Sequence, residues 1–486
     1  MTSHPDSTAV PPPGCPAHNG GGLPLYGPDF TADPAHVYER LRRQGPVAPA
    51  EILPGVDVML VTGYRAALQV LRTTDKYGKD SRRWRALNEG RVPADSLALQ
   101  AMAPRPNCQR TEGAEHARLR AAVSDAFQRV DVLALREHVE RTAGLLIDGF
   151  ATKGEADLLN DYAKPLSAYL LTALFGCPPE YSDRVVAATT DLFDGVEPGK
   201  ADNELVRCMA DMIALKRARP GEDVTTWLVQ HRVQLSVEEL IHQLIVIMAS
   251  GYEQEQNLIA NTLRLLLSDE RFAGSVGDGR LLVEDALSEV LWTDPPMANY
   301  AVHYPYVDTT LEGVPLQAGE PVVISFAAAN NDPALAGSLR TGNRAHLAWG
   351  AGPHRCPARE PAHVIASVAI ECVLDRLPDL SLAVPAEQLT WRPSPFTRGL
   401  VALPVTFPPA VRATPAPTGT PVPASPPSPD RGSGDTRRTT GPAPAPDPAP
   451  PSSAHEGADS SGREPDSRDG ARRWASNPLA RWWHGR

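Results

Sequence analysis

Hydrophobic residues recur with the period of an α-helix over much of the chain between residues 24 and 408. Apolar positions three and four residues apart place one side of such a segment against a core. Short, almost wholly apolar runs at 55–63 and 320–330 instead predict strands, the second followed by a turn. The sequence therefore predicts a mainly α fold with a small β region. Its principal amphipathic helices are expected at 113–127, 132–150, 162–176 and 361–378.

One predicted helix is much longer than the others and covers residues 236–269. Ser236 can cap its first turn, and Glu239, three residues later, can complete a capping box. At about 1.5 Å per residue, the segment extends roughly 50 Å. A helix of this length crosses a whole domain.

The two ends of the chain lack this pattern. Residues 1–23 are rich in Pro and Gly, and residues 409–486 are rich in Pro, Ala and Ser. Neither segment has enough apolar surface to offset the entropy of ordering it, so both are expected to be disordered. The last residues change again, to "RRWASNPLARWWHGR". This Trp/Arg segment is either a fortuitous end or a docking site for a protein partner or an anionic membrane surface.

Charge and cysteine content narrow the class of protein. A net charge of −11 argues against broad nucleic-acid binding. The six cysteines form no CxxC pair, which disfavours a disulfide framework or a zinc site. The N-terminus has no apolar core of a signal peptide, and the run at 244–249 is too short to span a bilayer. We expect a cytoplasmic protein.

The stretch "HLAWGAGPHRCPARE" at 346–360 contains the first candidate chemistry. Gly350 and Gly352 permit backbone turns that other residues avoid. Cys356 follows them and precedes a predicted helix, whose positive end favours an anionic sulfur. A lone thiolate in this position suits ligation of a single iron. A buried core cysteine remains an equal alternative from these residues alone.

The long predicted helix contains the second signal, "ASGYEQEQN". Gly251 inside a helix costs about 1 kcal/mol relative to Ala, so its missing side chain should serve a purpose. It can leave room for a flat ligand or for dioxygen. Glu253, Gln254 and Glu255 follow at once. The alternative is a polar helix face at a solvent edge.

Together these stretches resemble the cytochrome P450 superfamily. "WGAGPHRCPA" is similar to its haem-binding loop, with Ala358 where Gly is usual. "EHARLR", "AAANNDP" and "WRPSPFTRGLVALPVTF" resemble a haem-contacting helix, a strand-turn and the closing hairpin of that family. The resemblance extends over residues 24–408 and favours the soluble bacterial branch.

The resemblance implies the cytochrome P450 fold, with haem b as cofactor and Cys356 as the iron ligand. His116 and Arg120, four residues apart on one helix, together with His354, would contact the haem propionates. His303 stands where an Arg is usual. Gly251, Gly350 and Gly352 would complete the cofactor site.

The implied activity is that of a monooxygenase acting on an apolar small-molecule substrate. Electrons should come from a separate ferredoxin and ferredoxin reductase, because no GxGxxG nucleotide-binding fingerprint occurs in the chain. The basic cluster at 82–85 is either a solvated loop or a docking site for an acidic ferredoxin.

One departure from the family pattern concerns proton delivery. Glu253 occupies the acid position of the family's long helix, but Gln254 replaces the Thr that normally follows. A carboxamide has no hydroxyl to relay protons. We therefore hypothesise weakly coupled turnover, with reduced oxygen escaping as peroxide. Glu253 and Gln254 are the catalytic candidates, and either Glu253 or Glu255 could supply protons.

A second departure is Trp292 in place of the Arg in the family's Glu-x-x-Arg motif, as in a minority of actinomycete haem-thiolate proteins. Trp cannot neutralise Glu289, so Arg344 is the expected replacement. The alternative is that Trp292 is a simple core aromatic. These departures leave open a degenerate haem-binding sensor or assembly partner with little oxygenase activity, and also peroxide-driven oxidation.

Overall fold

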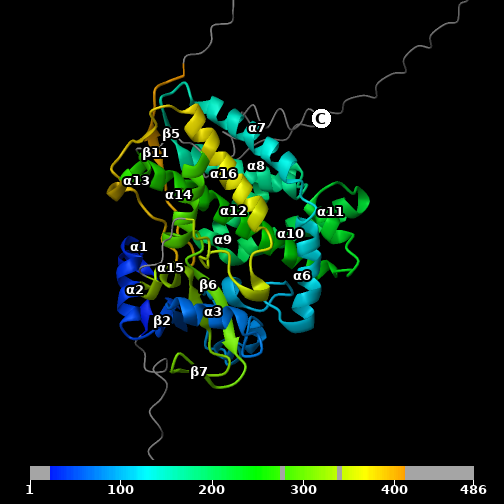
Figure 1. Cartoon of the computed structure of the whole chain (residues 1–486). Helices are drawn as coiled ribbons and strands as arrows, with labels where there is room; N and C mark the ends of the chain where they lie inside the picture. Colours follow the sequence, from blue (N-terminus) through cyan, green and yellow to red (C-terminus); the bar gives the residue numbers. More distant parts are fainter. Residues whose placement is uncertain (1–21, 274–279, 336–341, 411–486) are drawn as a thin grey trace, which may run out of the picture. The chain divides into compact units, whose positions relative to one another are not determined.

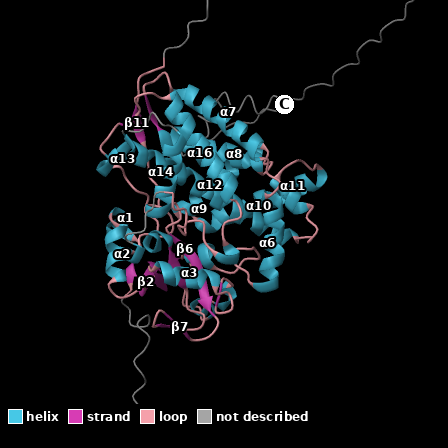
Figure 2. Ribbon diagram, viewed as in Figure 1, coloured by secondary structure: helices cyan, strands magenta, loops and turns pink. Residues whose placement is uncertain are grey.

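The computed structural model describes residues 22–273, 280–335 and 342–410. Helices dominate this part of the chain and the strands form small sheets, which confirms the predicted mainly α class (Figure 1, Figure 2). The segments expected to be disordered, 1–23 and 409–486, lie almost entirely outside the described residues. The same holds for the Trp/Arg segment.

The helices predicted from the sequence begin and end within two residues of the expected positions, and the structure has further helices that were not predicted. Their bounds are α1 Gly27–Ala32, α2 Pro34–Arg42, α3 Tyr64–Arg72, α4 Arg85–Asn88, α5 Ala98–Met102, α6 Gly113–Phe127, α7 Val132–Phe150, α8 Lys164–Leu174, α9 Pro179–Asp194, α10 Pro198–Ala218, α11 Val224–Val229, α12 Val237–Ser268, α13 Glu270–Ala273, α14 Arg280–Thr293, α15 Phe326–Asn330 and α16 Arg359–Arg376. The predicted bounds of α6 and α7 are confirmed to the residue. The predicted 162–176 helix is shorter, because a π-helical segment occupies residues 158–163 before α8.

Helix α12 is the long element predicted from the sequence. Ser236 Oγ accepts a hydrogen bond from the Glu239 N–H at 3.1 Å, and Glu239 Oε2 accepts one from the Ser236 N–H at 2.8 Å. This is the expected capping box, and it satisfies two N–H groups that a helix start leaves without partners. α12 packs against α8, α10, α14 and α16 in the middle of the helical region (Figure 1).

The strands are β1 Leu23–Pro24, β2 Val47–Leu53, β3 Val56–Val61, β4 Tyr77–Gly78, β5 Glu155–Asp157, β6 Asn299–Pro305, β7 Thr309–Leu311, β8 Val314–Leu316, β9 Val322–Ser325, β10 Ser381–Leu382 and β11 Pro404–Thr406. The main sheet has the order β1-β2-β3-β9-β6-β4. β3 is antiparallel to β2 and parallel to β9. The predicted strand-and-turn at 320–330 consists of β9 and the short helix α15.

The loop that contains Cys356 connects α15 to α16 and packs against α3. It therefore lies between the main sheet region and the helices around α12. This arrangement brings the two sequence signals, the cysteine loop and the centre of α12, into one region of the fold.

Candidate functional site

The cysteine loop has a backbone shape that only glycine accepts easily. Gly350 and Gly352 have φ values of 71° and 69°, in the left-handed region. A Cβ atom on Gly352 would lie 2.2 Å from the Leu71 carbonyl oxygen in α3. The Cys356 N–H donates to the Trp349 carbonyl oxygen at 2.8 Å. The loop is thus held close to α3, and Cys356 lies three residues before α16 begins.

The local environment of Cys356 does not by itself favour a thiolate. Burial raises the pKa of the Cys356 thiol, while the Ala358 N–H and the Arg120 guanidinium oppose this rise without cancelling it. The Ala358 N–H near the helix start does favour an anionic sulfur, as expected, but burial has the larger effect. A metal ion facing the sulfur supplies the charge that reverses this balance.

A cavity of about 250 Å³ lies between the cysteine loop and α12. The predicted site residues that line it are Arg120, Gly251, Gln254, Gly350, His354 and Cys356. Those that do not line it are His116, Glu253 and Gly352. The structure therefore brings the thiol and the glycine of the long helix to opposite walls of one cavity.

One part of the cavity lining is polar and carries basic side chains. Lys79, Arg120 and His354 line it there. His354 Nε2 lies 3.1 Å from Glu112 Oε1, and the His354 and His116 ring centroids are 3.9 Å apart. His116 therefore packs against His354 instead of lining the cavity. Burial lowers the pKa of His354, an effect that Glu112 opposes, and lowers that of His116 to about 4.

The sequence did not single out Lys79. Burial lowers the pKa of Lys79 to about 8, and its backbone N–H donates to Glu112 Oε1 at 2.5 Å. It lies in an irregular segment, where no hydrophobic period indicates which side chains are buried. His303, expected near the haem, is buried with Nδ1 2.8 Å from the Ala301 carbonyl oxygen, and it does not line the cavity.

Glu253, the acid of the expected pair, is held by other side chains. Arg392 Nη1 lies 2.6 Å from Glu253 Oε1. The side-chain amides of Gln256 and Asn257 donate to Glu253 at 2.7 and 3.0 Å. Burial raises the pKa of Glu253, and the Arg392 charge opposes that rise. Both Glu253 oxygens are therefore engaged, away from the residues that line the cavity.

Three residues close to Glu253 on α12, namely Gly251, Gln254 and Glu255, do line the cavity. A Cβ atom on Gly251 would meet only Leu171, at 3.4 Å, so helix packing does not require glycine there. No described residue makes a hydrogen bond to either amide atom of Gln254, or to Oε1 of Glu255. Glu255 is only 5% exposed, and burial raises its pKa well above the usual range.

The residues of the altered Glu-x-x-Trp motif have different partners from those we expected. Arg344 pairs with Glu284 at 2.8 Å, so its predicted pairing with Glu289 is wrong. Glu289 instead lies 3.4 Å from the exposed Arg271. Trp292 is 3% exposed, and its indole N–H donates to the Asn343 carbonyl oxygen at 2.7 Å. Trp292 thus ties α14 to the chain that leads into the cysteine loop.

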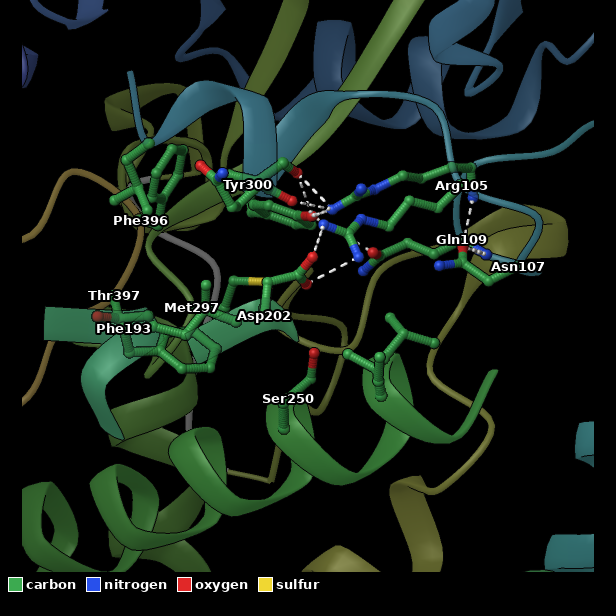
Figure 3. Close-up of a pocket in the computed structure, with 18 of the residues that line it drawn as sticks. Arg105, Asn107, Gln109, Phe193, Asp202, Ser250, Met297, Tyr300, Phe396 and Thr397 are labelled. Atoms are coloured by element: carbon green, nitrogen blue, oxygen red, sulfur yellow. Dashed lines mark hydrogen bonds and ion pairs between the residues drawn. The ribbon is translucent and has the colours of Figure 1, made fainter. Parts of the chain in front are cut away.

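A second pocket of about 110 Å³ adjoins the first, with which it shares five lining residues: Gln109, Val246, Ser250, Met297 and Tyr300. Its other lining residues are apolar and polar in about equal number. The polar ones include Arg105 and Asp202, which form a paired ion bridge with N–O distances of 2.8 and 2.9 Å (Figure 3). Figure 3 shows Ser250 on α12 on the opposite side of the pocket.

Comparison with known proteins identifies the family, although no family model matches the chain. It is 31% identical over 402 residues to the cytochrome P450 monooxygenase PikC of Streptomyces venezuelae, an alignment that covers 79% of this chain and 93% of PikC. The chain belongs to the cytochrome P450 family. This P450 is also 30% identical to cytochrome P450 107B1 of Saccharopolyspora erythraea, over 77% of its own length and 95% of the relative's.

Solved structures agree with this assignment. CYP154A1 from Streptomyces coelicolor A3(2) is 31% identical, with a TM-score of 0.72 over 79% of this P450 and all of that chain. CYP154C4 from Streptomyces sp. W2061 is 27% identical, with a TM-score of 0.74 over 79% and 97% of the two chains. The expected P450 fold is confirmed, and so is the class of enzyme, a monooxygenase that depends on haem iron. No helix among the described residues is long and apolar enough to cross a membrane.

The cavity suits the cofactor that the family uses. A thiol lies at one wall, and Gly251 keeps side-chain bulk away from the other. Lys79, Arg120 and His354 meet at one end, where two carboxylates can be neutralised. A flat macrocycle with an iron at its centre and two carboxylates on one edge matches this distribution.

Proposed function

We propose that this P450 holds haem b with Cys356 as the iron ligand and inserts one atom of dioxygen into an apolar small molecule. The observation that supports this best is the cavity that places the Cys356 thiol opposite Gly251. Arg120, Lys79 and His354 would hold the propionates, and His116 would support His354 through ring packing. When bound, the haem supplies the iron at which dioxygen is reduced and split.

The second pocket supports the proposed class of substrate. Leu192, Phe193, Ile245 and Phe396 give it apolar walls, and it adjoins the haem cavity through shared residues. An apolar body packed there would lie next to the oxygen-binding wall of α12. The Arg105–Asp202 pair forms a polar boundary to the pocket.

The proposed electron source is a ferredoxin with its reductase, working with this P450 in the cytoplasm. All five cysteines of the described part are free thiols, as a reducing compartment favours. The proposed catalytic domain comprises residues 24–408. The flanking segments, with the Trp/Arg segment, lie almost entirely outside the described residues.

The iron ligand can be tested by one spectrum. The purified protein, reduced under carbon monoxide, is expected to show the red-shifted Soret band of a thiolate-ligated haem. Cys356→Ser should abolish this band. Cys108→Ser is the matched control, because Cys108 lines the same cavity and should not ligate the iron. A thiolate spectrum that survives in Cys356→Ser would refute the proposal.

A second candidate function, a haem-binding sensor or assembly partner, is favoured by the absence of an alcohol at Gln254. The two functions differ in measurable ways. A ligand-induced spin shift and product formation with a surrogate ferredoxin and reductase support the enzyme. Retained haem without turnover, together with protein binding that is lost when residues 409–486 are removed, supports the partner role.

A further inference from the structure

We propose that Glu255, and not Glu253, is the acid that delivers protons to the α12 wall of the haem cavity, in place of the alcohol relay that Gln254 lacks. The inference rests on the proposed function, since it requires oxygen chemistry in this cavity. It assigns a catalytic role to a residue one position beyond the family's acid–alcohol pair.

The geometry distinguishes two acids that are only two residues apart. Both Glu253 oxygens are engaged, by Arg392, Gln256 and Asn257, and Glu253 does not line the cavity. Glu255 lines the cavity, and no described residue donates to its Oε1. A buried polar atom without a partner is costly, so its retention in a cofactor cavity points to a role there.

The protonation state of Glu255 agrees with this role. Burial raises the pKa of the carboxyl well above its usual range, which favours the neutral, protonated form. A protonated carboxyl has one O–H to donate, whereas a carboxylate can only accept. Lys79 and Arg120 line the same cavity, but they gather with His354 at its polar end.

The proton balance of the reaction defines the step. Each turnover consumes dioxygen, two electrons and two protons; one oxygen atom enters the substrate and the other leaves as water. Glu255 would give a proton to the oxygen atom that leaves, and its carboxylate would regain a proton from the solvent through a water molecule that is itself reprotonated. The Gln254 carboxamide, which can both donate and accept, would position that water molecule.

Infrared spectroscopy of the haem-loaded resting protein tests the acid without any turnover. The C=O stretch of a protonated carboxyl group should be present at pH 7 and should shift in deuterium oxide. Glu255→Gln should remove it, with the carbon monoxide Soret band unchanged. The difference spectrum between the parent and Glu255→Gln isolates this band from those of other carboxyl groups. A difference spectrum without it would show that Glu255 is ionised, and would overturn the proposal.

Cleavage of cumene hydroperoxide tests proton delivery without a ferredoxin or a substrate. Acid-assisted two-electron cleavage yields cumyl alcohol, and unassisted one-electron cleavage yields acetophenone. Glu255→Gln should lower the ratio of cumyl alcohol to acetophenone by at least about tenfold. Glu255→Asp, which keeps the acid, should retain part of the ratio.

Three results would overturn the assignment: an unchanged ratio in Glu255→Gln, an equal loss in Glu255→Asp, or a larger loss in Glu253→Gln. Neither experiment depends on the redox partner or on the substrate. A failure of the proposed function would instead appear as a missing thiolate Soret band, so the two failures are distinguishable.

Discussion

The two walls of the haem cavity differ in how far they follow the P450 pattern. The cysteine loop has the glycines, the histidine and the cysteine that the family resemblance implies, with Ala358 as its only departure. The α12 wall keeps the acid position but loses the alcohol, and the acid at that position faces Arg392. On the proposed function, holding the haem and delivering protons are therefore separable properties, and this chain departs from the family pattern mainly in the second.

The walls also differ in what makes them specific. The loop wall depends on backbone conformation, because Gly352 has almost no space between it and the Leu71 carbonyl oxygen. The α12 wall depends on the chemical identity of side chains on a regular helix. Substitutions should therefore affect folding and haem retention on the loop side, and coupling or pH dependence on the α12 side.

The largest effect is expected at Trp292, which supports the loop wall from α14. Trp292→Ala should lower the free energy of unfolding by about 3–5 kcal/mol, because it empties a buried site. Trp292→Phe keeps most of the packing and loses the hydrogen bond to Asn343, so its cost should be about 1–2 kcal/mol. Denaturant unfolding of the haem-loaded proteins measures both. Equal costs would show that packing of the ring is unimportant.

Gly352→Ala tests the backbone of the loop directly. Its Cβ would collide with the Leu71 carbonyl oxygen while φ stays positive, so we expect a loss of about 2–4 kcal/mol and lower haem occupancy. Gly195→Ala is the control, because Gly195 has a φ of 71° but no atom within 4 Å of an added Cβ. It should cost only about 1 kcal/mol and leave haem occupancy unchanged. Similar losses in the two variants would remove the argument for tight packing on α3.

Glu255 should make stability depend on pH. In the unfolded chain this carboxyl ionises near its usual pKa of 4.5, whereas the folded protein keeps the proton to a higher pH. The folded state then binds more protons, so its free energy of unfolding falls as pH rises above 4.5. Glu255→Gln removes this penalty and should gain about 1.4 kcal/mol relative to the parent for each pH unit, up to the pKa of the folded carboxyl. Urea unfolding at pH 5 and pH 7 measures the free energy of unfolding of the parent and of Glu255→Gln. If Glu255 is ionised in the folded state, the difference between the two proteins should be the same at both pH values.

Gln254→Thr should sharpen the α12 side of the comparison. Restoring an alcohol beside Glu253 offers a second route for protons, so less reduced oxygen should escape as peroxide. We expect about a threefold lower peroxide yield per NAD(P)H consumed, an effect of less than about 1 kcal/mol on the competing barriers. Tight coupling in the parent protein with a good substrate would refute the hypothesis of weak coupling.

The smallest effect is expected at Glu289. Its partner Arg271 is 63% exposed, and exposed ion pairs contribute about 0–1 kcal/mol. Glu289→Ala should therefore retain haem and lose less than about 1 kcal/mol of stability, as its carbon monoxide spectrum and unfolding curve can show. Complete loss of haem would mean that Glu289 keeps the structural role of the family's Glu-x-x-Arg pair.

Regular helices were predictable because their signal is local. The spacing of apolar residues determined both ends of 113–127, and the Ser236–Glu239 capping box marked the start of α12. The family resemblance likewise indicated Cys356 and Gly251. Both residues line the cavity because the fold brings the cysteine loop and α12 together there.

Ion pairs between distant segments were not predictable in this way. The sequence led us to pair Arg344 with Glu289, but side chains on irregular segments have no period that reveals their neighbours. The Arg105–Asp202 bridge and the burial of Lys79 went unnoticed for the same reason. The opposite orientations of Glu253 and Glu255 depend on which helices surround α12, and only the tertiary structure supplies that.

The shared wall between the two pockets has a consequence for altering the substrate range by protein engineering. A substitution at Met297, Tyr300 or Ser250 reshapes the haem cavity as well as the proposed substrate pocket, so a library built there would confound lost cofactor with lost selectivity. Of these two pockets, Phe193 and Phe396 line only the second. Variation at these two positions can change which molecules bind while leaving the lining of the Cys356 cavity unchanged.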